Sequence, residues 1–184
     1  MANEAPIPDY PRLVRAVLDG YTLPPWGAHG LSHWARVWEI GLRLAETTGA
    51  DPTIVRLFAI FHDSKRLNEN QDPRHGARGA LFAASLRGPG LDLADQDFVR
   101  LSIACEYHTH RKFHPDPTIQ TCWDADRLDL PRVGKRVNPD FIGTAAAKQP
   151  DIIAWAARRG IEDFVPALIK TDWGVDFGQT HADK

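Results

Sequence analysis

The spacing of apolar and polar positions predicts a chain built almost entirely of helices. Apolar residues recur with helical periodicity, whereas the alternation that is typical of a half-buried strand never runs far. The helices are expected over residues 10–19, 31–48, 53–65, 75–86, 95–108 and 119–130. Three further helices are expected over 140–148, 151–159 and 161–170, and Gly160 separates the last two. The tail, 171–184, is expected to be irregular. The pattern therefore indicates an all-α fold, a single-domain helical bundle spanning 1–184.

The segment 53–65, TIVRLFAIFHDSK, is apolar on nearly every face of a helix, which is typical of a buried helix. It begins after Asp51 and Pro52, an N-cap followed by a first-turn proline, and it ends in His62 and Asp63. A buried carboxylate is costly unless it is paired or coordinates a cation. The negative end of the helix dipole also favours a cation there. The segment therefore predicts a metal ion beside His62 and Asp63.

Other predicted helices carry further side chains that bind metals well. His33 and His108 each lie on an apolar stripe of their helix, and His75 opens another helix. Asp124 and Asp126 are two residues apart, so they face roughly opposite sides of the 119–130 helix and only one of them can bind a given ion directly. Histidine and aspartate together suit divalent transition metals such as Mn, Fe, Co, Ni or Zn.

Composition and charge narrow the class of protein. With 184 residues, 43% apolar and 25% charged residues, the chain is expected to be an ordinary globular protein. A formal net charge of −2 gives no reason to expect a nucleic-acid partner, and no apolar run is long enough to cross a membrane. The N-terminal residues lack the pattern of a secretory signal. Cys105 and Cys122 are expected to be buried, reduced thiols of a cytoplasmic protein. His29 and His114 lie in predicted loops and are expected at the surface.

The order of these residues resembles a known family. The motifs that carry the resemblance are HGLSHWARV at 29–37, FHDSKR at 61–66, DPRHGARGA at 72–80, CEYHTH at 105–110 and CWDADRLDL at 122–130. Together they are similar to the HD superfamily of metal-dependent phosphohydrolases, and most of all to its small stand-alone bacterial members. The resemblance covers about residues 30–133, and its specificity comes from the combination, since an HD dipeptide alone is common.

The resemblance implies a set of metal ligands. The primary ligands would be His33, His62, Asp63 and one aspartate of the 119–130 helix. The family has that aspartate after Ala and before Arg-Leu, which matches Asp126, and Asp124 is the alternative. The remaining aspartate would orient a ligand histidine or pair with the neighbouring arginine.

The resemblance also implies a second group of site residues. His75 and His108 match positions that bind a second metal or the substrate phosphate in some members, and His110 could replace or assist His108. Arg66 and Arg78 flank the motif loop and are candidates to hold phosphate oxygens through the guanidinium fork.

These ligands predict a hydrolytic reaction. A divalent ion held by imidazoles and carboxylates lowers the pKa of bound water and polarises a phosphoryl oxygen, and Asp63 could hold that water or take its proton. We therefore expect a metal-dependent phosphohydrolase acting on a nucleotide or another small phosphate ester, with Asp63 and Arg66 catalytic. One or two ions fit, and Mg is also admissible. The alternatives are an oxygenase with two irons, suggested by His75 and His108, and a nucleotide-binding module without turnover.

Overall fold

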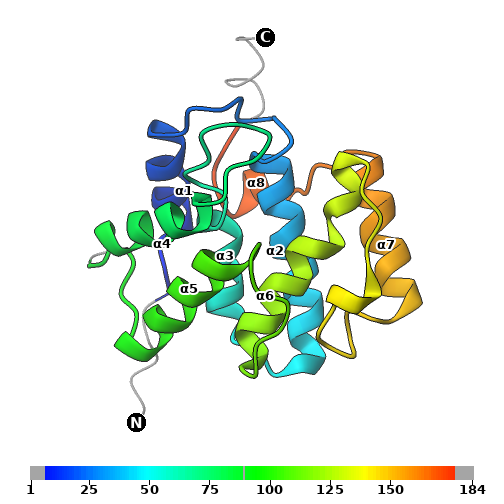
Figure 1. Cartoon of the computed structure of the whole chain (residues 1–184). Coiled ribbons are helices and arrows are strands. Elements are labelled where there is room, and N and C mark those ends of the chain that lie inside the picture. The colour runs from blue at the N-terminus through cyan, green and yellow to red at the C-terminus, as the bar shows by residue number, and fades with distance from the viewer. Residues whose placement is uncertain (1–6, 89, 177–184) are drawn as a thin grey trace.

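Helices α2, α3 and α6 form the centre of the protein, and the remaining helices pack around them (Figure 1). The computed structural model describes residues 7–88 and 90–176. The central helices are α2 (Leu31–Thr48), α3 (Pro52–Phe61) and α6 (Pro117–Leu128). Around them lie α1 (Tyr10–Asp19), α4 (His75–Ser85), α5 (Asp95–Tyr107), α7 (Pro150–Ile161), α8 (Leu168–Thr171) and the 3-10 helices η1 (Leu130–Val133) and η2 (Pro139–Phe141).

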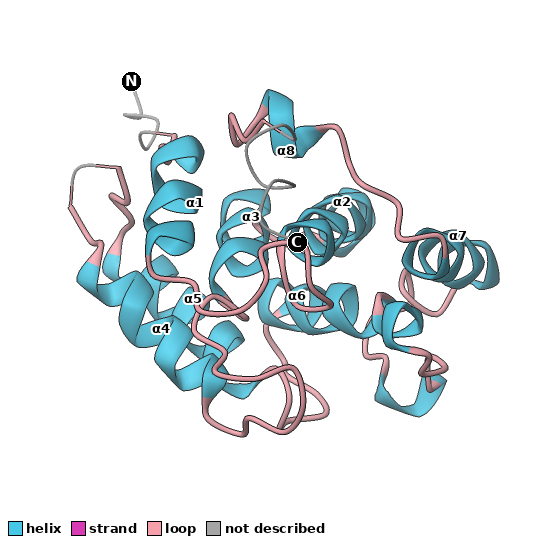
Figure 2. Cartoon of the chain, turned by 90° about the horizontal axis from the view of Figure 1, so that it is seen from above, coloured by secondary structure: helices cyan, strands magenta, loops and turns pink. Residues whose placement is uncertain are grey.

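The described part of the chain has no strand, so the predicted all-α fold is confirmed. Helices α4 and α5 pack on each other along one side of α3, whereas α7 packs on η1 and α2 on the opposite side (Figure 2). None of the helices in this part of the chain is long and apolar enough to cross a membrane. Cys105 and Cys122 are buried free thiols, as expected.

Helix α3 is the buried helix that the sequence predicts. The Asp51 side chain accepts hydrogen bonds from the backbone N–H groups of Thr53 and Ile54, and Pro52 occupies the first turn. Every residue from Leu57 to Phe61 is buried. The helix ends at Phe61, earlier than the expected 65, so His62 and Asp63 lie in the turn that follows. The Ser64 hydroxyl donates to the Phe61 carbonyl at 2.8 Å and closes this turn.

Two predictions for the C-terminal third are wrong. Residues 140–148 form no α-helix, and only their first two residues belong to the 3-10 helix η2. The carboxylate of Asp124 accepts hydrogen bonds from the backbone N–H groups of Gly143 and Thr144, which an α-helix would have used. Helix α7 continues through Gly160 instead of breaking there. A Cβ at Gly160 would lie 3.0 Å from the Arg132 nitrogen, so the glycine lets α7 pack closely on η1.

The next expected helix, over 161–170, is reduced to α8. Residues 162–167 form a loop with Pro166 inside it, and proline does not fit a helix interior. Beyond α8, the expected irregular segment still enters the core: Trp173 is 1% exposed and its ring lies edge-on to that of Trp38. Residues 177–184 of the expected tail lie outside the described residues.

Glycines fix how closely α4 approaches the two helices beside it. A Cβ at Gly79 would lie 2.3 Å from the Phe61 carbonyl oxygen, and a Cβ at Gly76 would lie 2.2 Å from that of Cys105. Both obstacles are backbone atoms at the ends of helices, so they cannot swing aside. These two residues, three apart in HGARGA, allow α4 to lie directly against the turn that carries His62 and Asp63.

We expect Gly79→Ala to destabilise the protein by about 1–3 kcal/mol because the added methyl group forces α4 away from α3. Glycine to alanine in a helix normally stabilises by about 0.5–1 kcal/mol, so the sign of the effect is diagnostic. Urea unfolding of the variant measures it. Leu81→Ala on the same helix, at a side chain 71% exposed, is the control and should change little. A stabilised Gly79→Ala variant would contradict this packing.

Candidate metal centre

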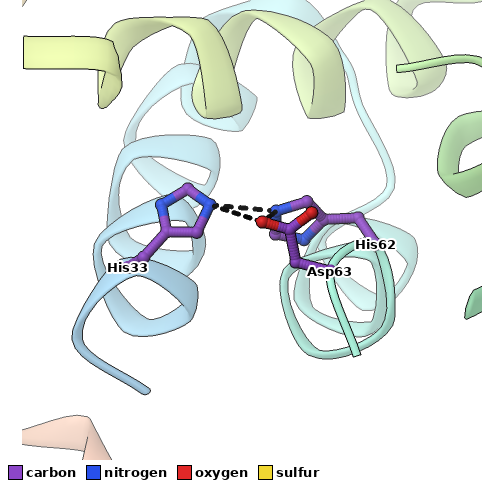
Figure 3. A group of neighbouring side chains, drawn as sticks. All are labelled: His33, His62 and Asp63. Atoms are coloured by element: carbon purple, nitrogen blue, oxygen red, sulfur yellow. Dashed lines mark hydrogen bonds and ion pairs between the residues drawn. The ribbon is translucent and has the colours of Figure 1, made fainter. Parts of the chain in front are cut away.

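The ends of several helices meet at one buried point. His33 lies in the first turn of α2, and His62 and Asp63 follow α3. His108 is the C-cap residue of α5, and Asp126 lies in the last turn of α6. Figure 3 shows His33 facing His62 and Asp63 across the gap between their helices. All these residues are buried except Asp126, whose side chain is 15% exposed.

The first ligand group is formed by two imidazoles and two carboxylates. His33 Nε2 lies 3.1 Å from His62 Nε2 and 3.6 Å from Asp63 Oδ2. Asp126 Oδ1 lies 3.4 Å from His33 Nε2 and 3.9 Å from His62 Nε2. Atoms bound to one ion at about 2.1 Å lie roughly 3.0–3.4 Å apart. These four side chains therefore need only small shifts to bind a single cation together.

A second group uses the other oxygen of Asp63. His75 Nε2 lies 3.1 Å from Asp63 Oδ1 and 2.9 Å from His108 Nε2, and His108 Nε2 lies 3.8 Å from the same oxygen. Asp63 Oδ1 is buried without a well-aligned hydrogen bond. Its neighbours are His75, His108 and Arg66, all at ion-pair distances, and a buried carboxylate oxygen beside two imidazole nitrogens favours a cation on this side as well. Asp63 is thus the residue that both groups share.

Each of the four histidines uses Nδ1 for a hydrogen bond that points its Nε2 inward. His62 Nδ1 donates to the Phe58 carbonyl at 3.0 Å, and His108 Nδ1 donates to the Cys105 carbonyl at 2.7 Å. The remaining two acceptors are the carbonyl of Asp72, for His75, and the carboxylate of Asp129, for His33. A carbonyl or an ionised carboxylate can only accept, so Nδ1 carries a proton, and a neutral ring then has its lone pair on Nε2. This is the arrangement in which histidine binds a metal.

Burial keeps two of these rings neutral. It lowers the pKa of His33 well below the usual value and lowers the pKa of His108 to about 4. At neutral pH both rings therefore offer Nε2 as a lone-pair donor. Burial acts against a proton on His75 as well, but the hydrogen bond to Asp63 raises the pKa of His75, so this ring favours a proton beside that carboxylate. The facing Nε2 atoms, 3.1 Å and 2.9 Å apart, therefore lie where a proton or a cation can bridge them. The donor set fits a divalent transition metal.

No family model matches the sequence, and no curated protein matches it. The structure, however, is similar to the crystal structure of a predicted HD superfamily hydrolase from an uncultured Thermotogales bacterium. The two chains are 25% identical, the match covers 83% of this chain and 86% of the other, and the TM-score is 0.59. This chain has the HD-domain fold. The expected fold family is confirmed, and the clustered histidines and aspartates occupy one site within that fold.

Asp124, the alternative ligand, is turned away from the HD-domain site. Its two oxygens accept hydrogen bonds from Gln120 Nε2 and from the backbone N–H groups of Gly143 and Thr144. The carboxylate therefore anchors the 143–144 segment, and neither orients a ligand histidine nor pairs with Arg127 as expected. Of the two aspartates, only Asp126 approaches the histidines.

Asp129 is a site residue that the sequence analysis missed. Its Oδ2 lies 2.8 Å from His33 Nδ1, and its Oδ1 accepts from Arg36 Nε at 2.8 Å. The side chain is fully buried. Asp129 follows Asp126 by three residues, which places both on one face of the chain as it leaves α6. The three-residue spacing of Asp126 and Asp129 could have indicated from the sequence that Asp129 also faces the site, where it orients His33.

Two residues expected at the site lie outside it, and one residue expected at the surface lies in its wall. His110 is exposed and its ring pairs with the Thr109 hydroxyl. Arg78 donates to the Lys65 carbonyl and pairs with Asp72, so it braces the 66–74 loop and does not face the cluster. His29 was expected at the surface but lines the site cavity, where its ring pairs with Glu69.

The cluster opens into a cavity of about 450 Å³. Asp63, Asp126 and His108 form part of its floor, and Arg66 forms part of its wall. Arg66 is 7% exposed, donates to the carbonyls of Asn68 and Asn70, and holds Nη1 at 3.5 Å from Asp63 Oδ1. The cavity is large enough for a small ligand to reach the cluster.

We expect Asp126→Asn and Asp124→Asn to have different effects, because Asp126 faces the metal ligands and Asp124 anchors the 143–144 segment. Asp126→Asn should lower the metal content of the purified protein, because it removes a charged oxygen from the first ligand group. Asp124→Asn should keep the metal content and lower the free energy of unfolding by about 1–3 kcal/mol, because hydrogen bonds to a charged group are lost. Elemental analysis and urea unfolding measure both effects. If Asp124→Asn lost metal and Asp126→Asn kept it, Asp124 and not Asp126 would be the metal ligand.

Asp129→Asn should weaken metal binding by about 10- to 100-fold, because the amide no longer fixes the His33 ring as strongly. Titration of the metal-free protein with Mn²⁺ or Co²⁺ measures the affinity. Asp140→Asn, at an exposed aspartate, is the control. Equal affinities of wild type and Asp129→Asn would show that Asp129 does not support the site.

Proposed function

We propose that this protein is a metal-dependent phosphohydrolase that acts on a nucleotide or another small phosphate ester. The observation that carries the proposal is the convergence of four buried Nε2 atoms on Asp63 beneath an open cavity. The similarity to a predicted HD superfamily hydrolase supports a hydrolytic reaction.

The proposed metal ligands are His33, His62, Asp63 and Asp126, with His75 and His108 completing a second position through Asp63. A divalent ion bound there would supply a more acidic bound water and a positive charge for a phosphoryl oxygen. The donors suit Mn, Fe, Co, Ni or Zn, since imidazole and carboxylate together favour these metals.

The residues of the chain supply the other elements of the reaction. Asp63 lines the cavity, so it can hold the attacking water or accept its proton. Arg66 Nη1 lies beside Asp63 Oδ1 in the cavity wall and is in position to bind a phosphoryl oxygen. The apolar floor beneath the cluster, with Phe58 stacked on His62, keeps bulk water away from the buried side.

Asp63→Asn should lower kcat by about 10²- to 10⁴-fold, because the amide cannot take a proton and binds a metal poorly. Phosphate release from a nucleotide panel, with Mn²⁺, Co²⁺, Ni²⁺ or Mg²⁺ added, measures it. Asp140→Asn is the control, since this aspartate is exposed and lies outside the cluster. The proposal fails if wild type releases no phosphate with any metal and Asp63→Ala leaves the metal content unchanged.

A second candidate function is that of an oxygenase with two irons, which the second ligand group of Asp63, His75 and His108 favours. It requires two irons per chain and oxygen consumption in the presence of substrate. One metal per chain, or phosphate release without oxygen uptake, would exclude it.

A further inference from the structure

A second cavity, of about 360 Å³, adjoins the cluster on the side of the 108–112 turn. It shares four lining residues with the first cavity, among them His108 and Asp126. A ligand placed over the cluster can therefore extend into both cavities. The second cavity is formed by the end of α5, the C-terminal end of α6 and the segment around η2.

The two cavities differ in charge. The first has Arg66, Arg132 and Lys135 opposite Asp63, Glu69 and Asp126, so its charges nearly balance. The second has several arginines and a lysine, and among the described residues that line it Asp126 is the sole acidic one. The chain as a whole carries a formal charge of −2, so this positive cavity is a local feature and not a property of the entire surface.

Arg127 is used to build the wall of the second cavity. Its Nη1 donates to the carbonyls of Lys112 and Phe141, at 2.8 Å and 2.7 Å, and its Nη2 donates to that of His108 and pairs with that of Arg111. One buried guanidinium therefore fixes the 108–112 turn against the η2 segment. With its donors occupied in this way, Arg127 does not serve as the cation that meets a ligand.

The cations that remain are at the rim. The Arg111 guanidinium lies over the Tyr107 ring, and the Lys112 ammonium lies over the Phe141 ring. Arg136 is exposed, and its side chain makes no hydrogen bond or ion pair with any other residue that the structure describes. An arginine without an anionic neighbour, at the edge of a positive cavity, is suited to a phosphate, which its planar fork binds through two hydrogen bonds.

We propose that this second cavity binds an additional phosphate group of the substrate, distant from the phosphate held at the cluster. The preferred substrates are then nucleotides that carry two separately attached phosphate groups. Their scissile phosphate lies over Asp63, their sugar or base lies in the first cavity, and their other phosphate meets Arg136. This inference rests on the proposed function, because it takes the phosphate at the cluster as given.

The test is equilibrium binding by calorimetry to the purified full-length protein. The probes are adenosine 3′,5′-bisphosphate, adenosine 5′-monophosphate and inorganic phosphate. Wild type should bind the bisphosphate more tightly than the monophosphate. Arg136→Ala should reduce this ratio of affinities by about threefold to tenfold, since one exposed charge-assisted contact is lost. Arg136→Glu should reduce it further. Arg158→Ala, at an exposed arginine of α7 that lines neither cavity, should leave the ratio as in wild type.

The inference is overturned if wild type binds both nucleotides equally, or if Arg136→Ala and Arg158→Ala give the same ratio. It is also overturned if inorganic phosphate binds beside the monophosphate with the same dependence on Arg136 while the bisphosphate gains nothing, because the cavity would then hold a free anion. Binding needs no turnover, so the two proposals can fail separately. An Arg136-dependent preference without phosphate release would disprove the hydrolase alone, whereas phosphate release without that preference would disprove the second cavity's role alone.

Discussion

Two pairs of buried imidazoles bring their Nε2 atoms together beside one carboxylate, and this arrangement favours a positive charge at that point. His33 and His62 approach to 3.1 Å, and His75 and His108 approach to 2.9 Å, in each case through Nε2. Their Nδ1 atoms are occupied elsewhere, and burial keeps His33 and His108 neutral. The carboxylate of Asp63 lies between the two pairs and adds negative charge. A divalent cation can bind one pair of imidazoles together with one oxygen of Asp63, and a second cation can do the same at the other oxygen. Cation binding is therefore the constraint on which this account of the site depends.

The helix ends explain how the fold holds these rings. A helix leaves its last carbonyls without intrahelical partners. His62 and His108 are the C-cap residues of α3 and α5, and each donates Nδ1–H to a carbonyl of its own last turn. The same hydrogen bond completes the helix and directs Nε2 to the cluster. Gly76 and Gly79 then allow α4, with His75 at its start, to pack against both helix ends.

Local patterns in the sequence were sufficient for the fold class and for most of the cluster. The apolar run of α3 and its two terminal polar residues indicated both a buried helix and a buried site. The roles of side chains that depend on tertiary contacts were harder to predict from the sequence. Helical periodicity could not distinguish an aspartate that binds backbone amides, Asp124, from one that faces the histidines, Asp126. Asp129 and Arg127 likewise act on segments that are distant from them in the sequence. The backbone amides of Gly143 and Thr144 bind Asp124 where the sequence predicted a helix, and this contact is also a tertiary one.

Anomalous diffraction from crystals grown with Mn²⁺ or Co²⁺ tests the central claim most directly. The account predicts an anomalous peak within bonding distance of His33, His62, Asp63 and Asp126, and it allows a second peak beside His75 and His108. Crystals grown with saturating metal that show no peak at this point, or that bind the metal only elsewhere on the protein, would contradict the account.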